Sequence, residues 1–248
     1  MEGYDDTTYG ERFAEVYDDW YGSITDTLAC VDAIVALSGG RHGGGNILEL
    51  GVGTGRLAIP LTELGMRVTG VDASPAMLER LRTKPGGERV TAVLGDMTDP
   101  PVPTQAFTVA FVAYNTLFNL VGPGQQQRCL TNCASRLEPG GALVVEAYVP
   151  SPGGAAADVV TTRRVTANQV VLSVSRSDPD RQEVQGQYVD ITEAGIKLRP
   201  WHIRWSTPEQ LDAMAADARL RLEDRWADWA GTPFTDASAS HVSVYRAP

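Results

Sequence analysis

Residues 49–55 read Glu49-Leu50-Gly51-Val52-Gly53-Thr54-Gly55 and carry the clearest structural signal in the chain. They begin inside the mostly apolar run at 47–50, which predicts a strand, and they precede a predicted helix at 56–64. Glycines at such a junction allow a tight turn and a close ligand approach, and the helix start offers free N–H groups. The spacing is GxGxG, with Arg56 where a dinucleotide-binding fingerprint has its third glycine. The turn therefore predicts a ligand site that departs from the dinucleotide pattern.

Acidic residues occur at the ends of the first three predicted strands. Glu49 would repel a pyrophosphate beside the glycine turn but suits a ligand that carries an ammonium or sulfonium cation. Asp72 follows a predicted strand at 68–71, where a carboxylate can accept both hydroxyls of a ribose. Asp96 follows the predicted strand at 90–94, where it can accept from an adenine amino group. These positions favour a nucleoside ligand with a cationic group.

Strands and helices alternate through the middle of the chain. After the glycine turn we predict a helix from Ser74 to Arg82, a strand at 107–112, a helix at 125–137 and a strand at 142–147. This alternation is typical of a parallel, doubly wound sheet whose sites lie at the carboxyl ends of the strands. The N-terminal stretch 9–37 is predicted to be helical.

The alternation of predicted strands and helices stops after a break of small residues at 150–157. Three consecutive strands are predicted at 165–174, 183–191 and 196–205, which indicates an antiparallel insertion. A capping box at Thr207 and Gln210 then starts a helix, and strands around 220–229 and 241–246 resume the main sheet.

The motifs ELGVGTGR (49–56), GVDAS (70–74) and GDM (95–97) resemble those of class I S-adenosylmethionine (SAM)-dependent methyltransferases. The resemblance covers 46–147 and resumes at 207–246. It implies an α/β, Rossmann-like, seven-stranded sheet that is mostly parallel, with the last strand antiparallel. The chain then divides into an N-terminal helical lid (1–38), a SAM-binding part (46–149), an antiparallel β insertion after the fifth strand (158–206), and a closing helix and hairpin (207–248).

The resemblance also implies roles for individual residues, with SAM as the cofactor. Glu49, Gly51 and Gly53 would hold its methionine end, Asp72 its ribose, and Ala73 and Met77 its sugar and adenine. Asp96 and Met97 would lie against the adenine, and Asn115 next to the transferred methyl group. The insertion is similar to that of the small-molecule branch that includes nucleotide-linked aminosugar N-methyltransferases. Aromatic lid residues would then cover the site, with Tyr17 and Tyr21 on the cofactor and Trp20 and Tyr114 on the acceptor.

Whether a base is needed depends on the acceptor, because a neutral amine needs little help whereas a hydroxyl must lose a proton. His202 is the sequence's best candidate for a base, and Arg204, on the same face of its predicted strand, could orient an anionic group. Tyr148 could position the nucleophile, and Glu146 could bind a substrate amine. The sequence thus favours N-methylation of a small amine in secondary metabolism, with O-methylation through His202 as the alternative.

The net charge of the chain limits the classes of partner that it can bind. The 21 basic and 31 acidic residues give a net charge of −10, which disfavours nucleic acids and anionic membranes, so a small-molecule acceptor is expected. An acidic N-terminus without a signal-peptide pattern predicts a cytoplasmic protein. We expect no metal site, because Cys129 and Cys133 have no further ligands nearby. A homodimer stays open, as do two other classes: a nicotinamide-dependent oxidoreductase, which Arg56 and Glu49 disfavour, and a non-catalytic protein with a SAM fold.

Overall fold

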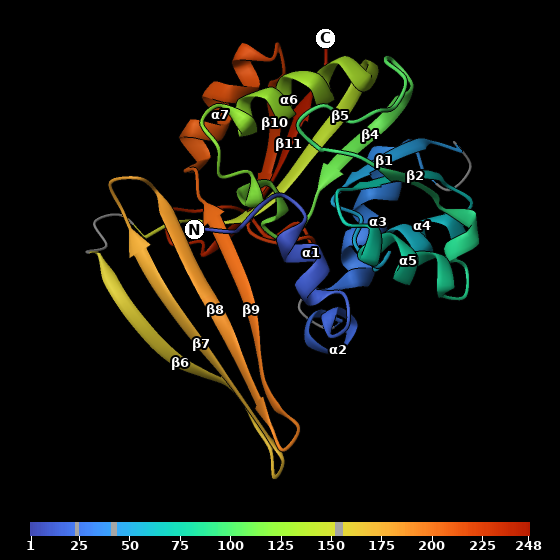
Figure 1. Cartoon of the computed structure of the whole chain (residues 1–248). Helices are drawn as coiled ribbons and strands as arrows, with labels where there is room; N and C mark the ends of the chain where they lie inside the picture. The colour runs from blue at the N-terminus through green and yellow to red at the C-terminus, as the bar shows by residue number, and fades with distance from the viewer. Residues whose placement is uncertain (23–24, 41–43, 152–155) are drawn as a thin grey trace.

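The main sheet of the protein confirms the predicted fold class. The computed structural model describes residues 1–22, 25–40, 44–151 and 156–248. The sheet consists of β1 (Asn46–Leu50), β2 (Arg67–Asp72), β3 (Thr91–Leu94), β4 (Phe107–Val112), β5 (Leu137–Tyr148), β10 (Arg221–Trp226) and β11 (Ser240–Arg246), in the order β10-β11-β5-β4-β1-β2-β3 (Figure 1). Strand β11 runs antiparallel to β5 and β10, and the other pairs are parallel. The last strand is therefore the antiparallel one, as expected.

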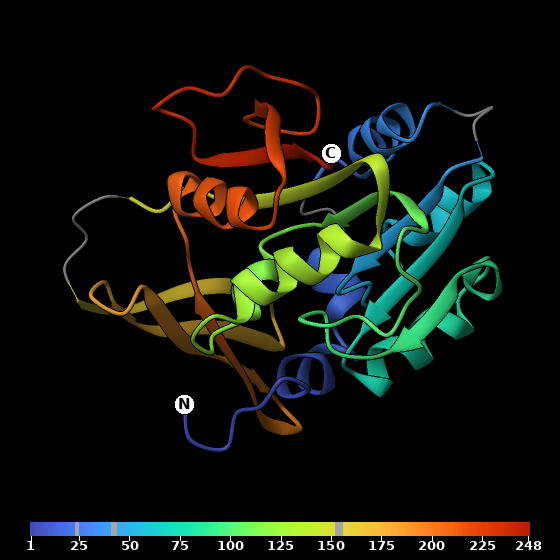
Figure 2. The ribbon, with the colours of Figure 1, turned by 90° about the horizontal axis from the view of Figure 1, so that it is seen from above.

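Helices cover both faces of this sheet (Figure 2). One face carries α3 (Thr27–Leu37), α4 (Ala58–Glu63) and α5 (Pro75–Thr83), and the other carries α6 (Gln125–Arg136) and α7 (Pro208–Asp217). Short 3₁₀ turns occur at η1 (Gly87–Arg89) and η2 (Thr116–Asn119). The predicted capping box is present, since the Thr207 side chain accepts from the Gln210 N–H and the Gln210 side chain accepts from the Thr207 N–H. Two apolar cores hold the layers together, one between each helical layer and the sheet face that it covers.

The N-terminal stretch predicted to be helical is divided. It forms α1 (Thr8–Phe13), α2 (Tyr17–Tyr21) and α3, whose N-terminus is capped by the Asp26 side chain accepting from the Ala29 N–H at 3.0 Å. Helix α1 packs between β9 and α5, away from α3. None of the helices in the described part of the chain is both long and apolar enough to cross a membrane.

The insertion forms a separate antiparallel sheet with one strand more than the sequence predicted. Its strands are β6 (Ala157–Val165), β7 (Gln169–Asp178), β8 (Glu183–Thr192) and β9 (Gly195–Arg204), in that order. The predicted strand at 165–174 begins too early, because a turn closed by the Thr166 N–H to the Gln169 carbonyl (2.9 Å) separates β6 from β7, which starts at Gln169. Strand β6 was missed because most of its residues are exposed and show no alternation. Part of the predicted break, 152–155, lies outside the described residues.

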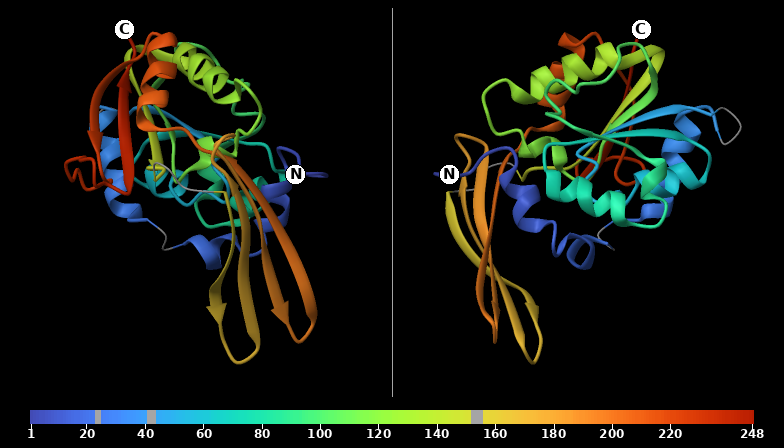
Figure 3. Two further views of the ribbon diagram at one scale, coloured as in Figure 1. Left: turned by 90° about the vertical axis from the view of Figure 1, so that its left-hand side faces the viewer. Right: turned by 45° about the vertical axis from the view of Figure 1, so that its right-hand side comes forward.

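The second sheet extends away from the main sheet as two long hairpins (Figure 3). Its β8 and β9 strands lie nearest α1, and β9 also contacts η2 at the end of the main sheet's β4. The N-terminal helices therefore sit where the two sheets meet, at the carboxyl ends of the parallel strands.

Candidate functional site

The glycine turn after β1 has a backbone that other residues could not adopt easily. Gly51, Gly53 and Gly55 have φ values of +73°, +54° and +83°, all in the left-handed region. A Cβ added to Gly51 would lie 2.3 Å from the Cγ2 of Thr116. The turn therefore needs glycine at 51 for both its dihedral angle and the space it leaves.

Glu49 is buried in β1 with an unsatisfied acceptor. Its side chain is only 4% exposed, and its Oε2 atom has no hydrogen-bond partner among the described residues. Burial raises the pKa of this carboxyl to about 8, opposed by the nearby charge of Arg56. A buried carboxylate oxygen without a donor is costly, and a ligand ammonium would supply both the opposite charge and an N–H group for it.

The two predicted aspartates stand at the ends of neighbouring strands. The Asp72 carboxylate accepts from the Gly53 N–H at 2.8 Å and from the Ser74 N–H at 2.9 Å, which fixes it beside the glycine turn. Burial raises the pKa of Asp72, and these backbone hydrogen bonds oppose the rise. Asp96 accepts from the Thr98 N–H at 2.7 Å after β3. Both carboxylates are thus held in place by the backbone.

These residues line one cavity of about 760 Å³ that opens to solvent, here called the glycine-loop pocket. Its lining includes eight residues predicted from the sequence: Gly51, Gly53, Asp72, Ala73, Met77, Asp96, Met97 and Tyr17. Glu49 is absent from the lining and lies buried in β1, next to the turn. The sequence did not predict Asp5 and Asp6, which join Asp72 and Asp96 there. With four carboxylates and no Lys, Arg or His among its described lining residues, the pocket suits a cationic ligand.

The turn after β4 is strained and held by hydrogen bonds. Tyr114 and Asn115 have φ values of +47° and +61°, which non-glycine residues rarely adopt and which often mark functional sites. The Tyr114 N–H donates to Glu146 Oε2 at 2.7 Å, and the Tyr148 N–H donates to Asn115 Oδ1 at 2.7 Å. The Glu146 carboxylate, which we expected to bind a substrate amine, therefore supports this turn.

A second cavity of about 720 Å³, here called the tyrosine pocket, adjoins the first. Its described lining is mostly aromatic and comes from both sheets and both N-terminal helices: Tyr9, Tyr17, Tyr21, Tyr114, Asn115, Thr116, Asn119, Tyr148, Arg163, Tyr188, Trp201 and Ile203. Tyr9, Tyr17 and Thr116 line both pockets, as does Asn119. A group in one pocket can therefore meet a group in the other at this boundary.

Three phenols of the tyrosine pocket, those of Tyr17, Tyr21 and Tyr148, stay protonated at neutral pH. Burial raises the pKa values of Tyr17 and Tyr148 to about 12 and raises that of Tyr21 as well. The Tyr17 and Tyr21 rings lie 4.9 Å apart, and Tyr21 meets Tyr114 edge-on at 6.1 Å. These side chains offer ring faces and hydroxyl hydrogen bonds, and they are poor bases.

Two polar contacts hold the N-terminal helices over the pockets. Asp18 of α2 accepts from the hydroxyl of Thr54, inside the glycine turn, at 2.6 Å and pairs with Lys84 at 2.6 Å. Glu11 of α1 accepts from the Ser74 hydroxyl at 2.8 Å. Helices α1 and α2 are thus attached to the glycine turn and to the end of β2, both of which line the glycine-loop pocket.

The structure places His202 and Arg204 away from both pockets. Their neighbours Trp201 and Ile203 line the tyrosine pocket. Successive side chains of a strand point to opposite faces, so the face of β9 that looks into the pocket is the one opposite to the face we expected. The His202 Nε2 atom lies 3.2 Å from Glu183 Oε2, and burial lowers the pKa of the imidazole. Arg204 donates to the Val121 carbonyl at 3.1 Å. His202 thus connects β9 to Glu183 of β8, and Arg204 connects β9 to the backbone at Val121.

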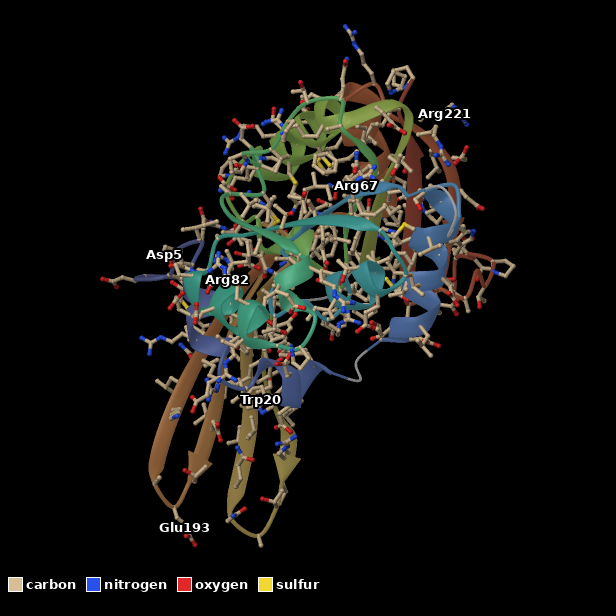
Figure 4. The ribbon with its side chains drawn as sticks, turned by 90° about the vertical axis from the view of Figure 1, so that its right-hand side faces the viewer. Asp5, Trp20, Arg67, Arg82, Glu193 and Arg221 are labelled. Carbon is tan, nitrogen blue, oxygen red and sulfur yellow. The ribbon has the colours of Figure 1, made fainter. Side chains whose placement is uncertain are left out.

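Trp20 also has a packing position. It is 9% exposed, meets Phe13 and Tyr188 edge-on at 6.2 and 5.6 Å, and does not line the tyrosine pocket. In Figure 4 it lies on α2 above the hairpins of the second sheet, whereas Glu193 marks a distant hairpin tip. Its ring contacts Tyr188 on β8, and the contact with the acceptor expected from the sequence stays a prediction.

Known proteins resemble the chain in sequence and fold. A family model described as a methyltransferase domain matches residues 47–141. The structure of the CcbJ methyltransferase from Streptomyces caelestis is similar, with 38% identity, a TM-score of 0.88, and 98% of this chain and 99% of that chain covered. The cypemycin N-terminal methyltransferase of Streptomyces sp is 28% identical over 248 residues, or 97% of this chain and 98% of that protein. A sugar N-methyltransferase from Streptoalloteichus sp shares the fold, with a TM-score of 0.69 at 21% identity and 99% of each chain covered.

The glycine turn, the acidic pocket beside it and the match over nearly the full length of a solved methyltransferase agree with one another. The chain belongs to the class I SAM-dependent methyltransferases that act on small molecules.

Proposed function

We propose that the protein transfers a methyl group from SAM to a neutral amino group of a small molecule held in the tyrosine pocket. One observation carries this choice: the described residues that line the pocket include no carboxylate or imidazole. A hydroxyl acceptor needs a base, and the phenols with raised pKa values are poor ones. A neutral amine already has its attacking lone pair.

For the cofactor we propose the residues of the glycine-loop pocket and its surroundings. Gly51 and Gly53 give the backbone room for the methionine end, and Glu49 would pair with its ammonium. Asp72 would accept from the ribose hydroxyls, with Ala73, Met77, Asp96 and Met97 around the sugar and adenine. The cofactor supplies an electrophilic methyl group on a sulfonium. The unsatisfied Glu49 oxygen and the four pocket carboxylates fit such a cation.

The chain's contribution to the reaction is alignment and exclusion of water. Displacement at a methyl group requires the attacking nitrogen to lie in line with the breaking bond, and correct placement lowers the barrier by several kcal/mol. Tyr17 and Thr116 border both pockets, so they would set the approach of the amine. Asn115 is held in place by its bond to the Tyr148 N–H and would guide the amine from the strained turn. The amine's proton would leave to water after the transfer.

The relatives support an amine acceptor by their names. The cypemycin enzyme acts at an N-terminus, and the Streptoalloteichus protein is a sugar N-methyltransferase. We therefore place the acceptor among small amines of secondary metabolism, a nucleotide-linked aminosugar included.

Paired acceptors test this proposal. Amines and alcohols with the same carbon skeleton, such as 2-phenylethylamine and 2-phenylethanol, or glucosamine and glucose, are incubated with SAM, and the demethylated donor is measured. We expect turnover only with amines, and a rate that rises with pH as the ammonium loses its proton. Turnover of the alcohols with inert amines would contradict the proposal.

His202→Ala provides a separate test of the base. Because the imidazole pairs with Glu183 and lies outside both pockets, we expect kcat/KM for an active amine to change by less than about threefold. The melting temperature should fall, because Glu183 loses its buried partner. A loss of roughly a hundredfold or more without a change in melting temperature would restore His202 as the base and O-methylation as the reaction.

A further inference from the structure

Arg163 is the one charged side chain among the described residues that line the tyrosine pocket. The chain as a whole carries a net charge of −10, and the adjoining glycine-loop pocket is lined by four carboxylates. A cation at the acceptor site therefore runs against the charge of its surroundings. Arg163 occupies the pocket in which the sequence analysis expected Arg204 to orient an anionic group, whereas Arg204 donates to the Val121 carbonyl.

A β-bulge sets the direction of Arg163. The pairing of β6 with β7 shifts register between Thr162 and Arg164, so Arg163 has no partner residue opposite it. Bulges redirect side chains and are frequent beside active sites. The guanidinium carbon lies 4.9 Å from the ring centroids of Tyr21 and Tyr188 and 5.1 Å from that of Trp20. The bulge thus brings a residue of an exposed edge strand to the pocket.

Within the described part of the chain, no carboxylate neutralises the charge of Arg163. Its donors reach the Trp20 carbonyl at 3.1 Å and the Tyr188 hydroxyl at 3.4 Å, and no carboxylate of the described residues forms an ion pair with it. The next residue, Arg164, pairs with Asp19 of α2 at 2.7 Å. The ion pair of Arg164 already connects β6 to α2, so this connection does not require the charge of Arg163. The guanidinium of Arg163 can therefore pair with an anionic group of a ligand. A guanidinium has five N–H donors, so several remain.

We propose that Arg163 recognises an anionic group, a carboxylate or a phosphate, on the acceptor. This inference rests on the proposed methylation in the tyrosine pocket and names the substrate class: an amine that carries an anion at a distance from the nitrogen. The aromatic walls exclude water around the pair, which strengthens it. The same positive charge opposes an ammonium and so favours the neutral amine that attacks.

Binding of simple anions tests the inference without requiring turnover. The protein is saturated with the demethylated donor and titrated calorimetrically with benzoate, phenyl phosphate and the uncharged benzamide. We expect one of the two anions to bind roughly tenfold or more tightly than benzamide, and its identity distinguishes a carboxylate from a phosphate. The preference should weaken at high salt. Arg163→Gln should abolish it, and Arg163→Lys should retain part of it.

Arg164→Gln is the matched control, since it removes a neighbouring charge that does not line the tyrosine pocket and should preserve the anion preference. Equal binding of all three probes by the unaltered protein would overturn the inference, as would an undiminished preference in Arg163→Gln. The first comparison needs no variant, so a folding defect cannot obscure it. Because the probes contain no amine, this result is independent of whether amines are methylated.

Discussion

Gly51→Ala is expected to weaken SAM binding by about a hundredfold or more. The added Cβ would lie 2.3 Å from Thr116 Cγ2, and alanine is strained at a φ of +73°. Relief requires the turn or Thr116 to move, and both line the glycine-loop pocket. Titration with the demethylated donor would measure the loss directly.

Two further variants separate the clash from the backbone strain. Gly65 has a φ of +85° but nothing within 4 Å of an added Cβ, so Gly65→Ala should lower the melting temperature slightly and leave donor affinity unchanged. Thr116→Ser removes the clashing methyl group, so adding it to Gly51→Ala should recover part of the affinity. Normal donor binding by Gly51→Ala alone would show that the pocket does not depend on this turn.

Glu49→Gln is expected to weaken donor binding by about a hundredfold or more at pH 8, because a ligand ammonium loses its buried partner. The pKa of Glu49 without ligand is about 8, so at pH 7 most of the protein must release a proton on binding. Donor affinity should therefore rise from pH 6 towards pH 8 and then level off, and this dependence should vanish in Glu49→Gln. Calorimetry in buffers of different ionisation enthalpy measures the released proton.

The same carboxyl links stability to pH in the opposite direction. Its folded-state pKa of about 8 lies above the ordinary value of 4.5, so the protonated carboxyl favours the folded state at low pH, and this stabilisation is lost as pH rises from 4.5 to about 8. The ligand-free Glu49→Gln variant should gain in melting temperature relative to the unaltered protein between pH 6 and pH 9. Glu63→Gln, at an exposed glutamate ending α4, is the control for both effects. Equal pH profiles for all three proteins would contradict the role of Glu49.

Local sequence patterns predicted which residues gather in the glycine-loop pocket, and their contacts with SAM stay predictions. Gly51 and Gly53 lie in one turn, and Asp72 and Asp96 follow strands whose order in a doubly wound sheet brings their ends together. Spacing along the chain therefore translates directly into a shared cavity. Asp5 and Asp6 carried no such signal, because they precede α1 in an irregular segment.

The tyrosine pocket, where we propose that the acceptor binds, depends on tertiary contacts that a single sequence does not encode locally. Tyr9 comes from α1, whereas Tyr188 and Trp201 come from the β8–β9 hairpin far along the chain, and only folding brings the helix to the hairpin. For β9 the alternation was clear, but a strand pattern does not say which face looks inward, so His202 was favoured over Trp201. Arg163 was missed because its strand was, and a bulge sets its direction.

The most direct test of the central claim is the position of the transferred methyl group on an acceptor that offers both nucleophiles. An amino alcohol or aminosugar that is active in the paired assay is methylated with SAM carrying a trideuterated methyl group, and fragment masses locate the label. The account predicts the label on nitrogen, in the unaltered protein and in His202→Ala alike. A label on oxygen that disappears in His202→Ala would contradict it.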